Sequence, residues 1–515
     1  MNLSIMATAV NWQKLQNGSD IRGVALAGVS GEPVNLTDKV VKKIAQAFAI
    51  WLSNKYEKSI SQLTISVGRD SRLSGEKLAQ AVITTLSNLG VKVYDFGLAS
   101  TPAMFMSTIV SDFLCDGAIM LTASHLPFNR NGLKFFTPTG GLEKQNIRDI
   151  LALAQEQEVN NIQQQGIIIR QNFLAIYANL FVNKVRSEVN HPEHYDTPLK
   201  GLKIIVDAGN GAGGFYADKV LQPLGADTTG SQFLDPDGTF PNHIPNPENK
   251  EAMASISEAV IKHKADFGII FDTDVDRAAA VDSQGKPLNR NRLIALISAV
   301  VLKEHPQSTI VTDSITSDGL TEFIENLGGK HHRFRRGYKN VINEAMRLNR
   351  ETEEESHIAI ETSGHGALKE NYFLDDGAYL VTKLLIELAK SHLEGQNLTD
   401  LINSLVEPVE SKEFRLHLKA EDFKGYGNLV IEKLNEFVDT QTDWEVVTPN
   451  YEGIRVKCSS NQEQGWFLLR LSLHDPVMPL NIETNIEGGV NHIVSRLLIF
   501  FAQWQHLDLA SINYR

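Results

Sequence analysis

The chain has 515 residues, 42% of them hydrophobic and 22% charged, which is enough sequence for three or four globular domains. Its formal net charge of −13 argues against a protein that works by coating nucleic acid or an anionic membrane, so an anionic ligand must meet a local basic pocket. The two cysteines, Cys115 and Cys458, exclude a disulfide framework and fit a reducing compartment. No apolar run approaches the roughly 18 residues of a membrane span. We expect a cytoplasmic protein.

Strand-like runs alternate with helical periodicity over most of the chain. The helical pattern predicts helices at 38–52, 77–89, 143–155, 215–224, 250–264, 292–303 and 318–327. Short apolar runs predict strands at 63–67, 91–96, 117–121, 202–206, 266–271, 309–311 and 358–361. Strands that alternate with helices of ten or more residues indicate doubly wound α/β sheets.

The last part of the chain has a different pattern. Strands are expected at 414–418, 454–458 and 466–473, and helices at 426–439 and 488–505, which indicates an α+β domain. Polar stretches at 156–165 and 187–198 separate the first α/β unit from the second. The expected fold is therefore three doubly wound, mixed α/β domains, at 1–165, 166–286 and 287–404, followed by a C-terminal α+β domain at 405–515.

Three carboxylates follow the apolar strand Phe267–Phe271. Asp272, Asp274 and Asp276 occur at alternate positions in the segment DTDVDR, where a tight loop can turn their oxygens toward one hard cation. An EF-hand does not fit, because Arg277 stands where glycine is needed and Ser283 where glutamate is needed. We predict a magnesium site, with a solvated acidic turn as the alternative.

Ser124 lies just beyond the predicted strand 117–121, at the strand end where ligands of open α/β sheets gather. Its neighbours do not fit the G-x-S-x-G pattern of a hydrolase nucleophile, and on these residues alone an ordinary Ser/Thr turn is the main alternative. The run GNGAGG at 209–214 fits a dinucleotide fingerprint only formally, and we interpret it as a tight turn.

Two charged runs receive modest interpretations. The acidic run 351–355 is typical of a solvated helix end or loop, and the basic run 330–336 favours a phosphate-facing edge over a nucleic-acid patch.

Taken together, the motifs resemble a known family. TASHLP around Ser124, DTDVDR, ETSGH at 361–365 and DIRG at 20–23 are similar to segments of the α-D-phosphohexomutase superfamily, which includes phosphoglucomutases, phosphomannomutases and phosphoglucosamine mutases. Further similar segments are VGRDSRLSG (67–75), STP (100–102), DAGNGAG (207–213), PDGTFPNHIPNPE (236–248), RGYK (336–339) and DDG (375–377). They occur in the family's order and span nearly the whole chain.

The resemblance implies a fold and a set of roles. Four domains would surround a central cleft, with the phosphoserine, metal-binding, sugar-binding and phosphate-binding loops in domains I to IV in turn. Ser124 would be the phosphoserine, and one Mg²⁺ per chain would bind a phosphoserine oxygen together with Asp272, Asp274 and Asp276. The resemblance also places Glu361, Ser363 and His365 in the sugar-binding loop, and it gives His365 a catalytic role. Arg22, Lys134 and Arg277 would contact the reacting phosphoryl group or assist proton transfer. Lys339 would bind a substrate phosphate.

Two segments depart from the family pattern. Leu126 stands where the family usually has asparagine in TASHNP. The loop that normally reads R-x-SGTEP keeps Arg470 and Ser472 but has Leu473 and His474 in place of Gly-Thr. We therefore expect the glycine-dependent backbone cradle to be lost, with His474 as a candidate replacement for the threonine donor.

The resemblance implies a phosphosugar mutase that interconverts hexose 1-phosphate and hexose 6-phosphate, with a sugar bisphosphate as activator. A phosphoglucosamine or phosphopentose mutase, and a catalytically weak sugar-phosphate binding protein, are the alternatives. We expect a small phosphosugar as the ligand, with neither nucleic acid nor a membrane as partner. Thr362 within ETSGH does not distinguish gluco, manno and glucosamine substrates, and the sequence leaves the oligomeric state open.

Overall fold

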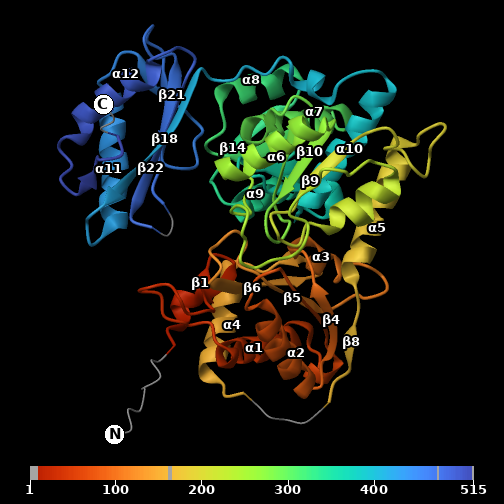
Figure 1. Ribbon diagram of the computed structural model, residues 1–515. Helices are drawn as coiled ribbons and strands as arrows, with labels where there is room; N and C mark the ends of the chain where they lie inside the picture. The colour runs from red at the N-terminus through yellow and green to blue at the C-terminus, as the bar shows by residue number, and fades with distance from the viewer. Residues whose placement is uncertain (1–9, 160–164, 473–474, 513–515) are drawn as a thin grey trace. The chain divides into compact units, whose positions relative to one another are not determined.

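The computed structural model describes residues 10–159, 165–472 and 475–512 (Figure 1). The described residues fall into two compact units. Met1–Asn289 together with Ser363–Leu398 make up the first, and Arg290–Thr362 together with Thr399–Arg515 make up the second. The chain therefore passes between the units three times.

The first unit begins with a mixed sheet in the order β1-β2-β6-β5-β3-β4-β8, with β7 paired to β6. The pairs among β5, β3, β4 and β8 are parallel, and those among β1, β2, β6 and β5 are antiparallel. The strands are β1 (Gln16–Asn17), β2 (Asp20–Val24), β3 (Thr64–Arg69), β4 (Lys92–Leu98), β5 (Gly117–Leu121), β6 (Arg130–Thr137), β7 (Gly140–Gly141) and β8 (Ile168–Arg170).

Helices cover both faces of this sheet. On one face α1 (Asp38–Tyr56), α2 (Gly75–Asn88) and α4 (Lys144–Glu156) share a core with β3, β5 and β6. On the other face lies α3 (Thr101–Met106), since a side chain at Gly68 would collide with Met104. Thr37 caps the start of helix α1, since its hydroxyl accepts a hydrogen bond from the amide of Val40.

The second sheet of this unit has the order β12-β11-β10-β9. β9 (Ile204–Asp207) and β10 (Phe267–Phe271) are parallel, while β10, β11 (Ala278–Asp282) and β12 (Pro287–Leu288) are successive antiparallel neighbours. Helix α6 (Lys250–His263) packs on β10 and β11, and α10 (Gly377–Leu393) contacts both β11 and α5 (Phe173–Val189). The short hairpin β16 (Gly366–Leu368) and β17 (Leu374–Asp375), with η5 (Lys369–Asn371) between its strands, precedes α10.

The second unit starts with three parallel strands in the order β14-β13-β15. These are β13 (Thr309–Asp313), β14 (Lys330–Phe334) and β15 (Ser356–Ile360), and the helices are α7 (Arg290–Glu304), α8 (Asp318–Asn326) and α9 (Tyr338–Glu351). The 3₁₀ turn η6 (Leu398–Ile402) follows α10 along the chain. The acidic run 351–355 lies at the end of α9 and in the loop beyond it, as predicted.

The C-terminal part is an antiparallel sheet in the order β19-β20-β21-β22-β18-β23. The strands are β18 (Glu410–Leu418), β19 (Trp444–Val446), β20 (Ile454–Cys458), β21 (Gly465–Leu469), β22 (Val477–Thr484) and β23 (Leu507–Asp508). Helices α11 (Phe423–Val438) and α12 (Gly489–Phe501) share its core. The predicted fold class, three mixed α/β domains followed by an α+β domain, is confirmed, while the residue boundaries of the four domains stay a prediction.

Several elements differ from the sequence-based expectation. The segment 215–224 is a π-helical turn, η3 (Tyr216–Leu221), followed by a 3₁₀ turn, η4 (Gln222–Leu224), instead of an α-helix. Pro223 lacks an amide hydrogen, so a regular α-helix could not continue through this position with all its bonds. The final helix ends at Phe501, before the expected residue 505, and β21 ends at Leu469, before the expected residue 473. The unpredicted elements include α5, α9, α10, β6, β14 and β22.

Within the described ranges, no helix combines the length and apolar character that crossing a membrane requires.

Candidate active site

Ser124 lies at the carboxyl end of the fully buried strand β5. Its backbone is left-handed, with φ of 50°, a conformation that non-glycine residues rarely adopt. The amide of Ser124 donates to the hydroxyl of Thr122 at 2.8 Å, which helps to hold this turn. The side chain is only 3% exposed, so its environment is set by the surrounding protein.

The loop between β10 and β11 brings three carboxylates together. Asp272, Asp274 and Asp276 are all buried, and they offer ligand oxygens that lie within 4.8 Å of one another. Oδ1 of Asp274 and Oδ1 of Asp276 have no hydrogen-bond partner among the described residues. Unpartnered buried carboxylate oxygens are costly, and they are the ligands that Mg²⁺ prefers. The donor set therefore fits a hard divalent cation.

The electrostatics of these carboxylates favour the same interpretation. Burial, reinforced by the charges of Asp276 and Asp274, raises the pKa of Asp272 well above its usual range. Burial also acts to raise the pKa of Asp276, but Lys134, His365 and Arg277 lower it below its ordinary value. A divalent cation would offset the burial and the like charges that together disfavour ionisation of Asp272.

Ser124 and the carboxylate loop meet within the first unit. The hydroxyl of Ser124 donates to Oδ2 of Asp272 at 2.9 Å, although the two residues are 148 positions apart in the sequence. Arg277 completes the contact, since its Nη2 donates to Ser124 Oγ at 2.8 Å and its Nε donates to Asp272 Oδ2 at 3.2 Å. One oxygen atom is thus placed between a carboxylate and a guanidinium.

Three cationic side chains surround this oxygen and the carboxylates. Lys134 Nζ lies 3.0 Å from Asp274 Oδ2 and 2.5 Å from Asp276 Oδ2. Burial alone would lower the pKa of Arg277, but Asp272 and Asp276 raise it, so its charge is secure. The guanidinium of Arg22 donates to the carbonyl of Ala123, the residue before Ser124, at 3.3 Å.

His365 also belongs to the first unit. Its Nδ1 lies 2.5 Å from Oδ2 of Asp375, and its backbone forms a β-bridge with Arg277. Burial disfavours the imidazolium, yet Asp375 and Asp276 raise the pKa of His365 to about 9. Gly364, with φ of 93°, permits the close approach, because a Cβ there would lie 2.6 Å from the carbonyl of Ala278. Ser363, also buried, precedes it in the same unit.

The remaining predicted substrate residues belong to the second unit. Glu361 follows β15 and accepts a hydrogen bond at 2.6 Å from the amide of Gly337, while Lys339 is in the first turn of α9. Arg470 follows β21 and lies 3.9 Å from Glu452, and Ser472 accepts a long bond of 3.4 Å from the amide of Asp475. Leu473 and His474 lie outside the described residues. Thr362 donates its hydroxyl to Asp313 at 2.8 Å.

Sequence reasoning did not single out four residues of this site. Thr101 donates to Asp274 Oδ2, Arg72 lies under the Ser124 loop, Asp375 binds His365, and the ring of His125 is 3.3 Å from Ser124 Oγ. Each occurs in a segment that carries the family resemblance, but only the fold indicates which side chain makes contact. Burial, with the charges of Arg277 and Arg22, lowers the pKa of His125 to about 2, so this imidazole is neutral.

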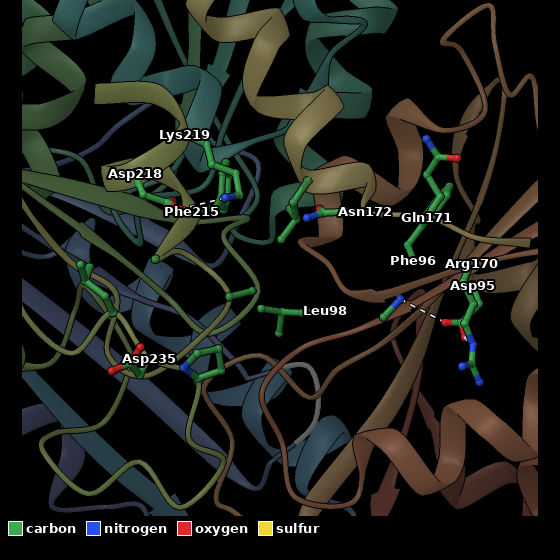
Figure 2. Close-up of a pocket in the computed structure, with 16 residues that line it drawn as sticks. Asp95, Phe96, Leu98, Arg170, Gln171, Asn172, Phe215, Asp218, Lys219 and Asp235 are labelled. Atoms are coloured by element: carbon green, nitrogen blue, oxygen red, sulfur yellow. Dashed lines mark hydrogen bonds and ion pairs between the residues drawn. The ribbon is translucent and has the colours of Figure 1, made fainter. Parts of the chain in front are cut away.

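One cavity of the first unit is lined by residues other than Ser124. It has a volume of about 760 Å³ and is lined by β4, the start of α5 and η3, with Phe96, Leu98, Asn172 and Phe215 among its residues (Figure 2). A smaller cavity of about 490 Å³ is lined by His125, Leu126 and Phe240. The loop that carries Ser124 therefore borders the smaller cavity. Leu126, which stands where the family usually has asparagine, forms part of the wall of this cavity.

Comparison with known proteins gives a consistent picture. Models described as phosphoglucomutase/phosphomannomutase, alpha/beta/alpha domains I, II and III, match residues 13–161, 177–285 and 289–409. A phosphomannomutase/phosphoglucomutase of Pseudomonas syringae is 31% identical over 83% of this chain and 85% of its own. A phosphoglucomutase of Neisseria gonorrhoeae is 28% identical over 95% and 96% of the two chains. The crystal structure of a phosphoglucomutase/phosphomannomutase family protein from Burkholderia thailandensis matches with a TM-score of 0.76 and 25% identity, covering 96% of this chain and 98% of that one.

Proposed function

Because this chain belongs to the phosphoglucomutase/phosphomannomutase family and is therefore a phosphohexomutase, an isomerase, we propose that Ser124 carries the phosphoryl group that the reaction moves. The bond between Ser124 Oγ and phosphorus breaks as a free sugar hydroxyl forms its own bond to phosphorus, and the proton that the hydroxyl loses balances the proton that Ser124 Oγ gains. The resulting bisphosphorylated sugar turns over in the site. Its other phosphoryl group then returns to Ser124, which exchanges hexose 1-phosphate and hexose 6-phosphate.

The observation that carries this proposal is the position of Ser124 Oγ, 2.9 Å from Asp272 and 2.8 Å from Arg277. A phosphoryl group in transfer needs positive charge around its equatorial oxygens and accurate positioning, more than covalent assistance. The guanidinium of Arg277 places a fixed positive charge in direct contact with the serine oxygen. Arg22 and Lys134 supply further positive charge at the backbone and carboxylates that flank it.

We further propose that Asp272, Asp274 and Asp276, with an oxygen of phosphorylated Ser124, hold one Mg²⁺. The unpartnered oxygens of Asp274 and Asp276 support this assignment. The bound cation would supply positive charge next to the transferred phosphoryl group. Lys134 bonds to two of these carboxylates and so keeps the loop closed around the position.

His365 is our candidate for proton transfer. Its Nδ1 is held by Asp375, which fixes the orientation of the ring beside the carboxylate loop. With a pKa of about 9 the ring is protonated at neutral pH, so in this state it is poised to give a proton to an oxygen from which phosphate departs.

The substrate is proposed to be a small phosphosugar. Glu361 and Ser363 would bind its hydroxyls, and Lys339, Arg470, Ser472 and His474 the phosphate that does not react. A sugar bisphosphate would act as activator by loading Ser124.

The buried, free thiols of Cys115 and Cys458 fit a cytoplasmic location.

A coupled assay tests this function directly. The enzyme is supplied with Mg²⁺, glucose 1,6-bisphosphate and, separately, the 1-phosphates of glucose, mannose, glucosamine and ribose, and formation of each isomer is followed. Turnover of a hexose 1-phosphate, together with a phosphorylated species in the intact mass that excess substrate removes, supports the proposal. Absence of both under these conditions refutes it.

A further inference from the structure

A single buried arginine binds much of the main chain of the Ser124 loop. Arg72 is only 1% exposed, and its guanidinium donates to four carbonyl groups, three in that loop and one at the start of β6. Nη2 donates to the carbonyls of Ser124 and Leu126, the latter at 2.5 Å, and Nη1 donates to those of Pro127 at 2.8 Å and Arg130 at 3.0 Å. The planar fork of an arginine can serve several acceptors in one plane, which the ammonium of a lysine cannot do.

Arg72 is itself held from two directions. Its Nε lies 3.4 Å from Asp70 Oδ2, and Asp70 Oδ1 accepts a bond from the amide of Arg72 at 2.9 Å. From the other side, the ring of Phe240 lies 5.3 Å from the guanidinium carbon, within range of a cation–π contact. The guanidinium therefore has little freedom to move away from the Ser124 loop.

Phe240 belongs to the irregular segment 231–249, which lies between η4 and α6, in the part of the chain that forms the second sheet of the unit. This segment packs closely on the turn around Arg72, because a Cβ at Gly238 would lie 2.4 Å from the amide nitrogen of Leu73. Further along the same segment, Asn246 Oδ1 accepts a bond at 3.3 Å from Nη1 of Arg277.

These contacts form a closed ring around the reactive oxygen. Arg277 binds Ser124 Oγ, Asn246 binds Arg277, Phe240 covers Arg72, and Arg72 holds the carbonyl of Ser124. The ring fixes the left-handed backbone of Ser124 relative to Arg277, although the two come from different sheets.

We propose that Arg72 is a positioning residue for phosphoryl transfer, and that Phe240 supports it. The proposal rests on the proposed role of Ser124. Arg72 touches neither Ser124 Oγ nor the three carboxylates, so it acts through the backbone that carries Ser124. A displacement of about 1 Å at the attacking or leaving oxygen can slow such a reaction by about a hundredfold.

The test compares Arg72→Lys with Arg130→Lys. The second variant is a matched control, because the side chain of Arg130 is partly exposed and pairs with Glu32 at 2.6 Å. Each protein is loaded with glucose 1,6-bisphosphate, its phosphoserine content is measured by intact mass, and transfer to glucose 1-phosphate is followed in a single turnover. KM, the Mg²⁺ concentration for half-maximal rate and Tm are measured alongside.

We expect Arg72→Lys to slow single-turnover transfer by about tenfold or more, with KM and the Mg²⁺ requirement changed by less than about twofold. Arg130→Lys should transfer at the wild-type rate. A purely structural role would lower Tm and the amount of active enzyme, but would leave the transfer rate of each phosphorylated molecule unchanged. That result for Arg72→Lys overturns the proposal.

Phe240→Leu decides the question if Arg72→Lys does not fold. It keeps all four guanidinium bonds and removes only the ring, so we expect transfer to slow by about twofold to fivefold. Wild-type transfer in a folded Phe240→Leu protein would then count against the proposal. If the proposed role of Ser124 were wrong, the result would be different, because the wild-type enzyme itself would acquire no phosphate on Ser124.

Discussion

Arg277 in the first unit and Arg470 in the second are both largely buried, but they have very different surroundings. Arg277 has ionised or polar partners in Asp272, Asn246 and Ser124, and its carboxylate neighbours raise its pKa. Among the described residues, Arg470 has one carboxylate within 4 Å, that of Glu452 at 3.9 Å, and burial lowers the pKa of Arg470. Its Nε has no hydrogen-bond partner among the described residues.

The difference indicates two ways of using a guanidinium. A group that stabilises a reacting phosphoryl must be fixed before substrate arrives, and preorganised partners achieve this at the cost of burying several charges. A group that receives an anion from solvent does better with vacant donors, because the anion itself then supplies the missing charge. We therefore expect changes near Arg277 to affect the rate and changes at Arg470 to affect substrate binding.

The largest effect should come from Ser124→Ala. Removal of the hydroxyl leaves Arg277 and Asp272 in place but leaves no oxygen to carry phosphate, so turnover should fall by about a thousandfold or more. Intact mass should show a phosphorylated fraction in the wild type and none in the variant. Ser111→Ala, an exposed serine of the same unit, serves as the control and should retain wild-type phosphate and rate. Full activity of Ser124→Ala would rule out the phosphoserine.

Asp274→Asn should produce the next largest effect. The amide keeps the shape of the side chain but weakens its affinity for a divalent cation, so Mg²⁺ affinity should fall by at least about tenfold and turnover should fall with it. Thermal unfolding offers a separate measurement, since Mg²⁺ should raise the Tm of wild type and raise that of the variant much less. Asp218→Asn, which changes an exposed carboxylate of η3, is the control. An undiminished response to Mg²⁺ in Asp274→Asn would place the metal elsewhere.

Arg470→Ala tests the other side of the comparison. Loss of a charged, two-pronged donor should raise KM by about tenfold, while kcat falls by a smaller factor. Arg415→Ala removes an exposed arginine from β18 of the same unit and should leave both constants unchanged. If Arg470→Ala lowers kcat at constant KM, the contrast between the two arginines is wrong.

The smallest effect concerns stability and pH. His365 has a folded-state pKa of about 9, above the ordinary value near 6.5, so its contribution to stability is fully present below pH 6.5 and disappears as pH rises through 9. His365→Gln should therefore lower Tm more at pH 6 than at pH 9.5, with EDTA present in both. His492→Gln, exposed on α12, provides a control. A difference in Tm that grows with pH would reverse the assigned sign.

Sequence reasoning succeeded where a pattern is local. Strand β5 was predicted with its observed bounds and β10 to within one residue, because every residue in each is buried and each is a continuous apolar run. The spacing of Asp272, Asp274 and Asp276 predicted that their carboxylates would turn toward one position, and the structure brings these carboxylates together. The roles of Ser124 and the flanking cations came from resemblance to a family, not from spacing.

Sequence reasoning failed where a structural element depends on partners that are distant in the sequence. Fourteen of the 17 residues of α10 are buried, so the helix has no polar stripe from which a period could be recognised. β14 reads KHHRF, and its charged side chains find partners only after the sheet has formed. Arg72 illustrates the same limit at the site, because its four carbonyl acceptors lie more than 50 positions away along the chain.

The discontinuous first unit has a consequence for synthesis on the ribosome. Residues 1–289 emerge first and contain Ser124, the three aspartates and Arg277, but α10 and the hairpin before it come from Ser363–Leu398. Until that segment emerges, Tyr177 and Tyr216 lack Asp376 and Thr382, to which their hydroxyls bond at 2.7 Å. The nascent chain must therefore keep an apolar surface on α5 and β11 uncovered while more than seventy residues of the second unit are translated. A truncated product ending near residue 289 would accordingly be prone to aggregation and would lack His365 and Asp375.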